Sequence, residues 1–170
     1  MPLEEETIAE SMQSLGYCTF FAGKWHLGPD ESFWPEKQGF EVNRGGWKSG
    51  GPYGPGKYFT PYGNPRLEDG PDGEHLPIRL AEETASFVER CVELYEPFFA
   101  TLCFYSVHTP LIGPKELVQK YREKRQRLGL ADLAAFGEER QVFRTDRKRR
   151  VRIVQHHAVY AAMVESMDRA

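Results

Sequence analysis

Near the start of the chain, the hydrophobic positions change from helical spacing to a nearly continuous apolar run. Over 7–15 the apolar residues recur at helical spacing, and Thr7 and Glu10 stand at the spacing of a capping box, in which each side chain accepts a hydrogen bond from the other residue's backbone. Residues 17–22 are then nearly all aromatic or apolar and lie between glycines, as is typical of a buried strand. The pattern predicts a helix over 7–15 and a strand over 17–22.

A second helix and strand are predicted further along the chain. Over 79–95 the apolar residues gather on one helical face and the acidic residues mostly on the other. Residues 98–107 lie between two prolines and are nearly all apolar, which favours a strand covered on both faces over a short helix. This order of elements predicts an α/β fold with a mostly parallel sheet and flanking helices.

The segment between these two pairs, residues 29–75, keeps no regular period and is rich in glycine, proline and aromatic residues. Connections of this length are usually functional loops or linkers. Disordered linkers usually lack aromatic residues, so we expect an ordered excursion that packs over the rest of the fold. Whether it lines a substrate entrance or serves only as scaffolding stays open.

The last third of the chain is more polar. Residues 116–130 predict a charged helix, and 132–152 read as irregular and basic, with Arg147, Lys148, Arg149, Arg150 and Arg152 close together. This basic segment favours a solvated surface loop, although attraction of nucleic acid or sulfated glycan stays open. Residues 159–170 return to helical spacing without a C-terminal cap, so we expect the chain to end inside a helix.

Composition narrows the classes of protein. A chain of 170 residues with a formal net charge of −3 is not expected to bind nucleic acid or an anionic membrane as a whole. No apolar run reaches the length of a membrane span, and no export signal is expected at the start. Cys18, Cys91 and Cys103 are far apart and form no CxxC pair, which predicts core thiols rather than a zinc site or a disulfide framework.

Three side chains with charge or proton-carrying chemistry follow the two predicted strands. Lys24 and His26 are two residues apart, so on an extended strand they would face one pocket while Trp25 packs behind them. His108 follows the second strand, and ligands gather at the carboxyl ends of strands in such sheets. An amine and imidazoles together suit an anionic substrate, although each taken alone also fits a structural role.

The segment that holds Lys24 and His26 resembles the sulfatase family. Residues 16–28 read GYCTFFAGKWHLG, which matches the family's second signature, Gly-Tyr-x-Thr-x-x-x-Gly-Lys-Trp-His-Leu-Gly, at every fixed position. Further similarity covers 58–65, 69–74, 97–110 and 160–168, and only 126–155 looks unlike the family. The resemblance implies a partial sulfatase catalytic domain over 1–170, with the signature in a helix and strand at 7–28, a loop at 29–75, a helix and strand at 79–110, and a charged helical region at 115–170.

The resemblance also implies a fold and a chemistry. Sulfatases have an alkaline-phosphatase-like α/β sandwich, of which this chain would be an incomplete part, and they hydrolyse sulfate esters with a formylglycine nucleophile and a calcium ion. By resemblance, Lys24 would contact the formylglycine and the sulfate, and His26 would take the proton that allows sulfate to be expelled. His108 would bind sulfate or protonate the leaving oxygen.

Departures from the family's pattern limit this expectation. None of the three cysteines lies in the Cys/Ser-x-Pro-x-Arg motif from which formylglycine is made, and the Asp and Asn residues that hold calcium in the family are not matched. We therefore expect no metal ligands in this chain and no turnover by the chain alone. Two alternatives stay open: a non-enzymatic protein that binds sulfated glycans, and a phosphatase or phosphonate hydrolase of the same superfamily.

The resemblance leaves other properties less defined. It implies a sulfate-ester substrate, either an aryl sulfate or a sulfated carbohydrate, and an extracytoplasmic location for the complete protein. It implies neither a particular natural substrate nor an oligomeric state.

Overall fold

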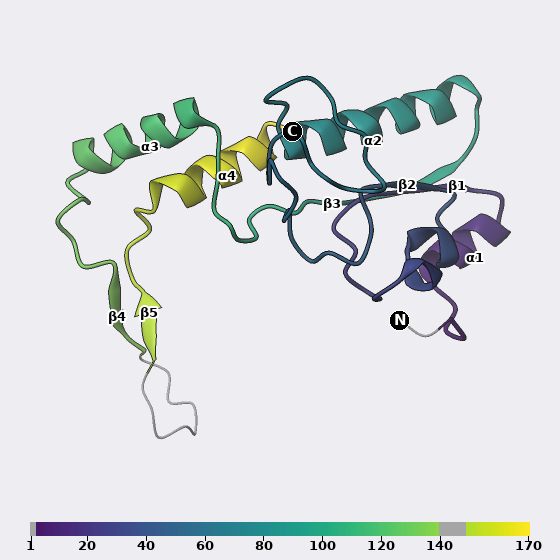
Figure 1. Cartoon of the computed structure of the whole chain (residues 1–170), viewed down its shortest axis with the longest axis horizontal. Coiled ribbons are helices and arrows are strands. Elements are labelled where there is room, and N and C mark those ends of the chain that lie inside the picture. Colours follow the sequence, from purple (N-terminus) through teal and green to yellow (C-terminus); the bar gives the residue numbers. More distant parts are fainter. Residues whose placement is uncertain (1–2, 140–148) are drawn as a thin grey trace.

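The computed structural model describes residues 3–139 and 149–170. Its centre is a three-stranded parallel sheet in the order β2, β1, β3, formed by Val42–Arg44, Cys18–Gly23 and Phe98–Cys103 (Figure 1). β1 is the middle strand, and Phe20 stands opposite Val42 on one side and Ala100 on the other. The prediction of an α/β fold with a parallel sheet and flanking helices is confirmed.

Helices cover both faces of the sheet because alternate residues of β1 bury opposite sides. Helix α2, Leu76–Glu93, packs on the face of Phe20, whose ring stacks on Phe87 with centroids 4.6 Å apart. Helix α1, Ile8–Ser14, packs on the other face, where Ala9 is buried with Phe21. The capping box predicted for α1 is present, with the Thr7 amide donating to Glu10 Oε2 over 2.7 Å.

The predicted boundaries differ from the observed ones around α2 and β3. α2 begins three residues before the predicted start, because a proline is tolerated in a first helical turn, where the amide that it lacks has no helical partner. β3 ends at Cys103, four residues before the predicted end. Among the described strands β3 pairs with β1 alone, so its residues are mostly half-buried. Both of its faces are nevertheless covered, since Ala100 and Leu102 pack against the cluster under α2, and Phe99 and Cys103 pack against the cluster on the other face.

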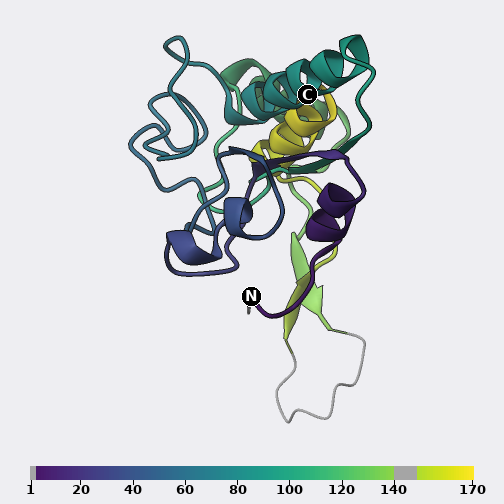
Figure 2. The ribbon, with the colours of Figure 1, turned by 90° about the vertical axis from the view of Figure 1, so that its right-hand side faces the viewer.

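The segment 29–75 is ordered and packs over the sheet, as expected. It contains two 3-10 turns, Glu31–Phe33 and Pro35–Lys37, and the short strand β2. Its aromatic residues supply core: Trp34, Phe40, Tyr58 and Tyr62 are all buried. Figure 2 shows the segment as blue and teal loops gathered beside the sheet.

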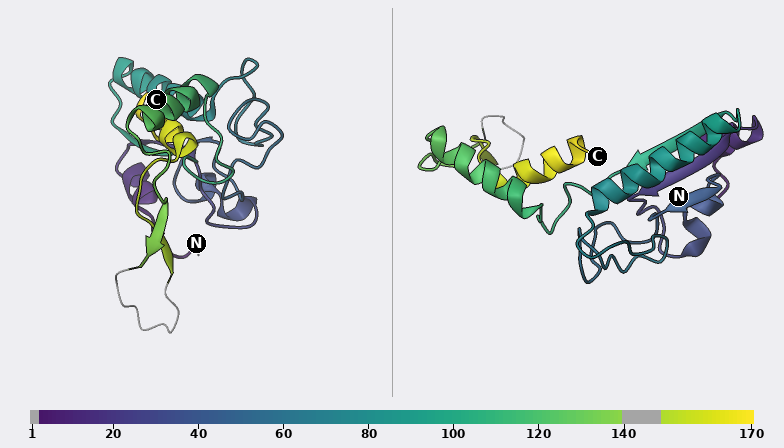
Figure 3. Two further views of the ribbon diagram at one scale, coloured as in Figure 1. Left: turned by 90° about the vertical axis from the view of Figure 1, so that its left-hand side faces the viewer. Right: turned by 90° about the horizontal axis from the view of Figure 1, so that it is seen from above.

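The C-terminal part forms a helix pair and a hairpin. Helices α3, Lys115–Arg127, and α4, Ala158–Asp168, lie side by side and share a small core of Leu117, Val118 and Ala162 (Figure 3). Glu165 of α4 accepts from the ammonium of Lys120 over 2.7 Å, and this hydrogen bond, with a further one from the Tyr121 hydroxyl, lowers the pKa of its carboxyl to about 2. α4 ends at Asp168, so the helix predicted over 159–170 stops before the last residue.

The prediction of irregular structure over 132–152 is wrong for two short segments of that range. β4, Phe136–Glu138, and β5, Arg150–Arg152, pair as antiparallel strands. The guanidinium groups of Arg150 and Arg152 lie over the Phe136 ring, 5.8 and 4.6 Å from its centroid. Arg147 and Lys148 of the basic segment lie outside the described residues.

The three cysteines lie in the core or at its margin. Cys91 is buried, Cys18 and Cys103 are half-buried, and all three are free thiols, which agrees with the core positions predicted for them. Across the described ranges no helix combines the length and the apolar character that crossing a membrane requires.

Candidate active site

The carboxyl end of β1 is built on a close approach between two backbones. Gly23 has φ of +102°, and a Cβ at this residue would lie 1.8 Å from the carbonyl oxygen of Cys103. The next amide, that of Lys24, donates to the same oxygen over 2.7 Å. The glycine of the signature therefore allows β1 to stay paired with β3 to its last residue, and Lys24 emerges at that edge of the sheet.

Lys24, Trp25 and His26 follow the strand in different environments. The Trp25 indole donates to the Phe33 carbonyl over 2.8 Å and packs edge-on against Phe21, so its ring packs toward the core as expected. His26 is exposed and has φ of +58°, a left-handed conformation that costs a non-glycine residue roughly 1–2 kcal/mol. Because β1 ends at Gly23, strand alternation does not set the direction of His26; the left-handed turn does.

Two consecutive glycines bring His26 and His108 together. A Cβ at Gly50 would lie 2.3 Å from Nδ1 of His26, and a Cβ at Gly51 would lie 2.9 Å from Nδ1 of His108. The two imidazoles therefore lie against neighbouring residues of one loop, although they follow different strands. These glycines were not predicted as site residues, since their place in a run of glycines and prolines is the one signal that the sequence offers for them.

The turn that carries His108 is held by buried tyrosines. The His108 amide donates to the Tyr105 carbonyl over 2.9 Å, and the Tyr105 hydroxyl donates to the Gly45 carbonyl over 2.8 Å. The Tyr58 hydroxyl lies 3.0 Å from the Tyr105 carbonyl oxygen and 2.8 Å from that of His108, and donates to them. Burial raises the pKa of Tyr58 to about 12, so it remains a donor at neutral pH.

The surroundings of the His108 ring determine which nitrogen faces the site. Nδ1 lies 2.7 Å from the carbonyl oxygen of Thr109, and a carbonyl can only accept, so Nδ1 carries a hydrogen. Nε2 is then the nitrogen that can meet a ligand. The Tyr53 ring stands edge-on to His108, with ring centroids 5.8 Å apart, and is 61% exposed; it adds an aromatic surface that was not predicted from the sequence.

Lys24 adds positive charge at the same edge. Its side chain is half-buried, and within the described residues its ammonium has no carboxylate partner. An unpaired ammonium and two imidazoles at the end of parallel strands suit an anionic ligand with several oxygen acceptors.

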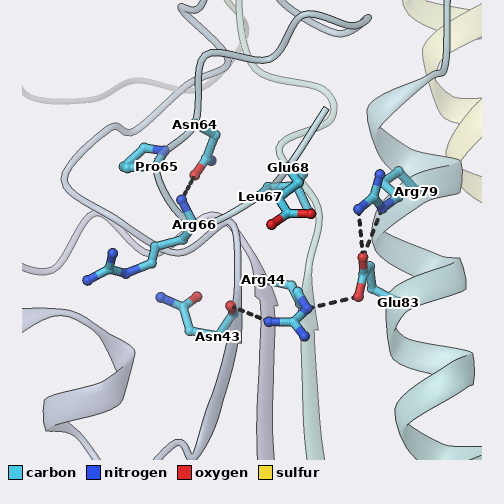
Figure 4. A pocket seen from close by; sticks show the side chains of 9 residues that line it. All are labelled: Asn43, Arg44, Asn64, Pro65, Arg66, Leu67, Glu68, Arg79 and Glu83. Carbon is cyan, nitrogen blue, oxygen red and sulfur yellow. Dashed lines mark hydrogen bonds and ion pairs between the residues drawn. The ribbon is translucent and has the colours of Figure 1, made fainter. Parts of the chain in front are cut away.

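A separate pocket of about 400 Å³ lies between the 29–75 segment and α2 (Figure 4). Arg44 and Arg79 both donate to Glu83, over 2.8 and 2.9 Å. Burial opposes the charged form of Glu83, but the hydrogen bonds from Arg79 and Arg44 outweigh it and lower the pKa of this carboxyl. The pocket's arginines are thus partly neutralised, so it is a weaker candidate for binding an anion than the edge with Lys24.

Metal-ligating side chains do not gather at this edge. Among the residues that the structure describes, the one group of three that could hold an ion is Cys18, Cys91 and Glu96. Cys18 is the first residue of β1, whereas Lys24 follows the last one, so this group lies at the opposite, amino-terminal end of the strand.

Comparisons with known proteins agree with one another. The model of the family described as Sulfatase matches residues 1–170. An uncharacterized sulfatase of Schizosaccharomyces pombe is 32% identical over 128 residues, which is 68% of this chain and 23% of that protein. Arylsulfatase G of Rattus norvegicus is 27% identical over 168 residues, covering 78% of this chain and 31% of that protein. The chain therefore spans less than a third of the length of either relative.

A solved structure supports the same fold. The crystal structure of Ps i-CgsB superposes on 99% of this chain and 35% of its own, with a TM-score of 0.66 and 20% sequence identity. At that identity the similarity shows the fold alone.

Proposed function

This chain belongs to the sulfatase family, and we propose that it forms the cationic part of a site that hydrolyses sulfate esters. The single observation that carries the proposal is the pair of imidazoles, His26 and His108, held against Gly50 and Gly51 at the strand edge where Lys24 emerges. A sulfate monoester presents three acceptor oxygens and one negative charge. The ammonium and two imidazoles offer donors and positive charge to such a group.

Each side chain has a distinct role in this proposal. The Nζ of Lys24 binds a sulfate oxygen as a cation. When a nucleophile forms a new bond to sulfur and the bond from sulfur to the ester oxygen breaks, Nε2 of His108, if protonated, would donate its proton to that oxygen, so the alcohol would leave neutral, while Nδ1 remains bound to the Thr109 carbonyl. His26, exposed beside the same loop as His108, offers a second imidazole that can accept a proton from a hydroxyl group bound in the site.

Formylglycine and calcium do not fit the residues of this chain. No Cys/Ser-x-Pro-x-Arg segment occurs in its sequence. The described group that could hold an ion contains two thiols, whereas calcium prefers oxygen ligands. We therefore derive no step through either group, and we propose that the 170-residue chain binds sulfate esters without hydrolysing them.

The substrate class and location follow from the family and are proposals. One structure of Ps i-CgsB holds k-i-k-neocarrahexaose, and for this chain we propose a sulfated carbohydrate, or an aryl sulfate that would pack on the exposed Tyr53 ring. We propose an extracytoplasmic location for the complete protein.

Equilibrium dialysis of the chain against p-nitrophenyl sulfate tests the proposal. We expect saturable binding that weakens at least tenfold in both Lys24→Ala and His108→Ala, with no release of p-nitrophenol. Lys37→Ala is the matched control, because it removes an equally positive but exposed side chain from the turn at Pro35–Lys37.

The results also separate the alternatives. Equal binding by parent and His108→Ala would contradict the proposal. Tighter binding of p-nitrophenyl phosphate than of p-nitrophenyl sulfate would favour a phosphate-ester hydrolase of the same superfamily. Calcium-dependent release of p-nitrophenol by the purified chain would contradict the claim that it only binds.

A further inference from the structure

The amino end of β1 brings together two thiols and a carboxylate. Cys18 begins β1, Cys91 lies in the last turn of α2, and Glu96 precedes β3. The Cys18 thiol donates to Glu96 Oε2 over 3.2 Å, and the two Sγ atoms and a Glu96 carboxylate oxygen all lie within 4.8 Å of one another. Three potential metal ligands thus converge on one point, although Cys18 lies far from the other two in the sequence.

Each of these residues is held in place by the backbone. The Cys18 amide donates to the Pro97 carbonyl over 2.9 Å, which fixes the start of β1 beside the start of β3. Cys91 is completely buried against the core of α2. The sheet and α2 therefore set the positions of the two thiols.

The end of α2 places Glu96 against Cys91. The Glu96 amide donates to the Cys91 carbonyl and the Tyr95 amide to the Val92 carbonyl, over 2.9 and 3.2 Å, which is the Schellman arrangement. Its left-handed position is usually glycine, but here it is Tyr95, with φ of +57° and 96% exposure. The chain adopts this unfavourable conformation and thereby turns Glu96 back over the helix end.

We propose that Cys18, Cys91 and Glu96 form a binding site for a thiophilic divalent cation of the zinc type. In a tetrahedral site with Zn–S bonds of about 2.3 Å, two sulfurs stand roughly 3.8 Å apart. The three ligand atoms lie within 4.8 Å of one another, so they need to approach by only about 1 Å to reach that geometry. Glu96 is exposed, which leaves the fourth position to water.

The ligand set selects the metal and defines the proton balance. Thiolates favour zinc, and their presence excludes calcium and magnesium as the preferred ions. Binding of Zn²⁺ releases the two thiol protons, and the resulting two thiolates and one carboxylate give the site a net charge of −1. The ion would join the start of β1, the end of α2 and the segment before β3, so it would stabilise the fold.

Titration of the reduced 170-residue chain with Co²⁺, followed by displacement with Zn²⁺, tests this site. We expect one Co²⁺ per chain, with the near-ultraviolet absorption of sulfur-to-cobalt charge transfer, and loss of that band on adding Zn²⁺. Cys18→Ser should abolish the band, and Glu96→Gln should weaken binding at least tenfold. Cys103→Ser is the matched control, because Cys103 is a half-buried free thiol at the other end of the sheet.

A second readout keeps the test independent of variant folding. Zn²⁺ should slow alkylation of Cys18 by iodoacetamide in the parent chain and leave the rate at Cys103 unchanged. The proposal is overturned if the fully reduced chain shows no charge-transfer band, if Cys18→Ser retains it, or if Zn²⁺ protects Cys103 as strongly as Cys18. None of these results bears on sulfate-ester binding, which uses other residues.

Discussion

Histidines at the sheet edge and in the core of this protein differ in what their surroundings allow. His26 is exposed, and Nε2 of His108 faces the site because Nδ1 is bound to the Thr109 carbonyl; a glycine lies against the Nδ1 side of each ring. His75 is only 9% exposed, with Nδ1 2.9 Å from the Ser166 hydroxyl, and its Nε2 is buried without a hydrogen-bond partner in the part of the chain that the structure describes. Burial lowers the pKa of His75 to about 4.

Histidine therefore has two different roles in this protein, one in the core and one at the strand ends. A neutral, buried imidazole such as His75 contributes to packing, and protonating it costs stability. An imidazole at a strand end, with one nitrogen held by a carbonyl and the other available, can bind an anion or transfer a proton. The surroundings of each ring produce the difference: burial for His75, an adjacent glycine for His26, and an adjacent glycine with a backbone acceptor for His108.

The anion site at the carboxyl end of β1 should be lost altogether if β1 and β3 cannot approach each other closely. Gly23→Ala places a methyl group 1.8 Å from the Cys103 carbonyl oxygen, and we expect it to lower the free energy of unfolding by at least about 3 kcal/mol. Gly16→Ala is the control, since Gly16 also has a positive φ but has no atom within 4 Å of the added Cβ. Urea denaturation measures both variants, and equal losses would mean that backbone strain alone explains the effect.

Acid should destabilise the fold through His75. Its pKa is about 4 in the folded chain and about 6.5 when unfolded, so between these values the unfolded state binds more protons. The free energy of unfolding should therefore fall by up to about 3 kcal/mol as pH drops from 6.5 to 4.

A double variant isolates this effect from other groups. His75→Phe with Ser166→Ala removes the titrating ring and its hydroxyl partner together. We expect its stability to fall less than that of the parent between pH 6.5 and 4, as measured by urea denaturation at each pH. An unchanged slope would show that His75 is not the group responsible.

Removing the hydroxyl beneath the His108 turn should weaken both the fold and the site. Tyr58→Phe keeps the buried ring but removes the donor to the Tyr105 and His108 carbonyls, which we expect to cost about 1–2 kcal/mol of stability. Binding of p-nitrophenyl sulfate should weaken as well, because His108 loses its support. Tyr95→Phe, at a highly exposed side chain, should change neither quantity.

The smallest effect on stability and binding is expected in the loop of Gly50 and Gly51, which lies against the rings of both histidines. A methyl group at Gly50 would lie 2.3 Å from Nδ1 of His26 and should displace this exposed ring. We expect Gly50→Ala to weaken binding of p-nitrophenyl sulfate about tenfold, or about 1.4 kcal/mol, with little change in stability. Gly73→Ala, remote in the same long segment, should leave binding unchanged, and a similar loss there would contradict the role given to Gly50.

Local patterns in the sequence were sufficient to predict the elements that depend on neighbouring residues. The capping box of Thr7 and Glu10, the strand after it and the helix before Pro97 each follow from the side chains of a few consecutive positions. β2 and the β4–β5 hairpin were missed because strands of three residues carry too little periodicity to be recognised.

Contacts between distant segments could not be read from the chain. The placing of Gly50 against His26 depends on how residues 29–75 fold back over the strand edge. Similarly, the spacing of Cys18 and Cys91 suggested no metal site, and only the packing of α2 on β1 brings their sulfurs together. Lys24, His26 and His108 were selected from residue chemistry and family resemblance, and their roles remain predictions.

The most direct test of the central claim is a long-range ¹H–¹⁵N spectrum of the histidine side chains during titration of the chain with inorganic sulfate. We predict saturable shifts of the ring nitrogens of His26 and His108 at the same sulfate concentration, with the signals of His75 unmoved. Shifts at His75, or no shift at His26 and His108 while sulfate binds elsewhere, would contradict the assignment of the strand edge as the anion site.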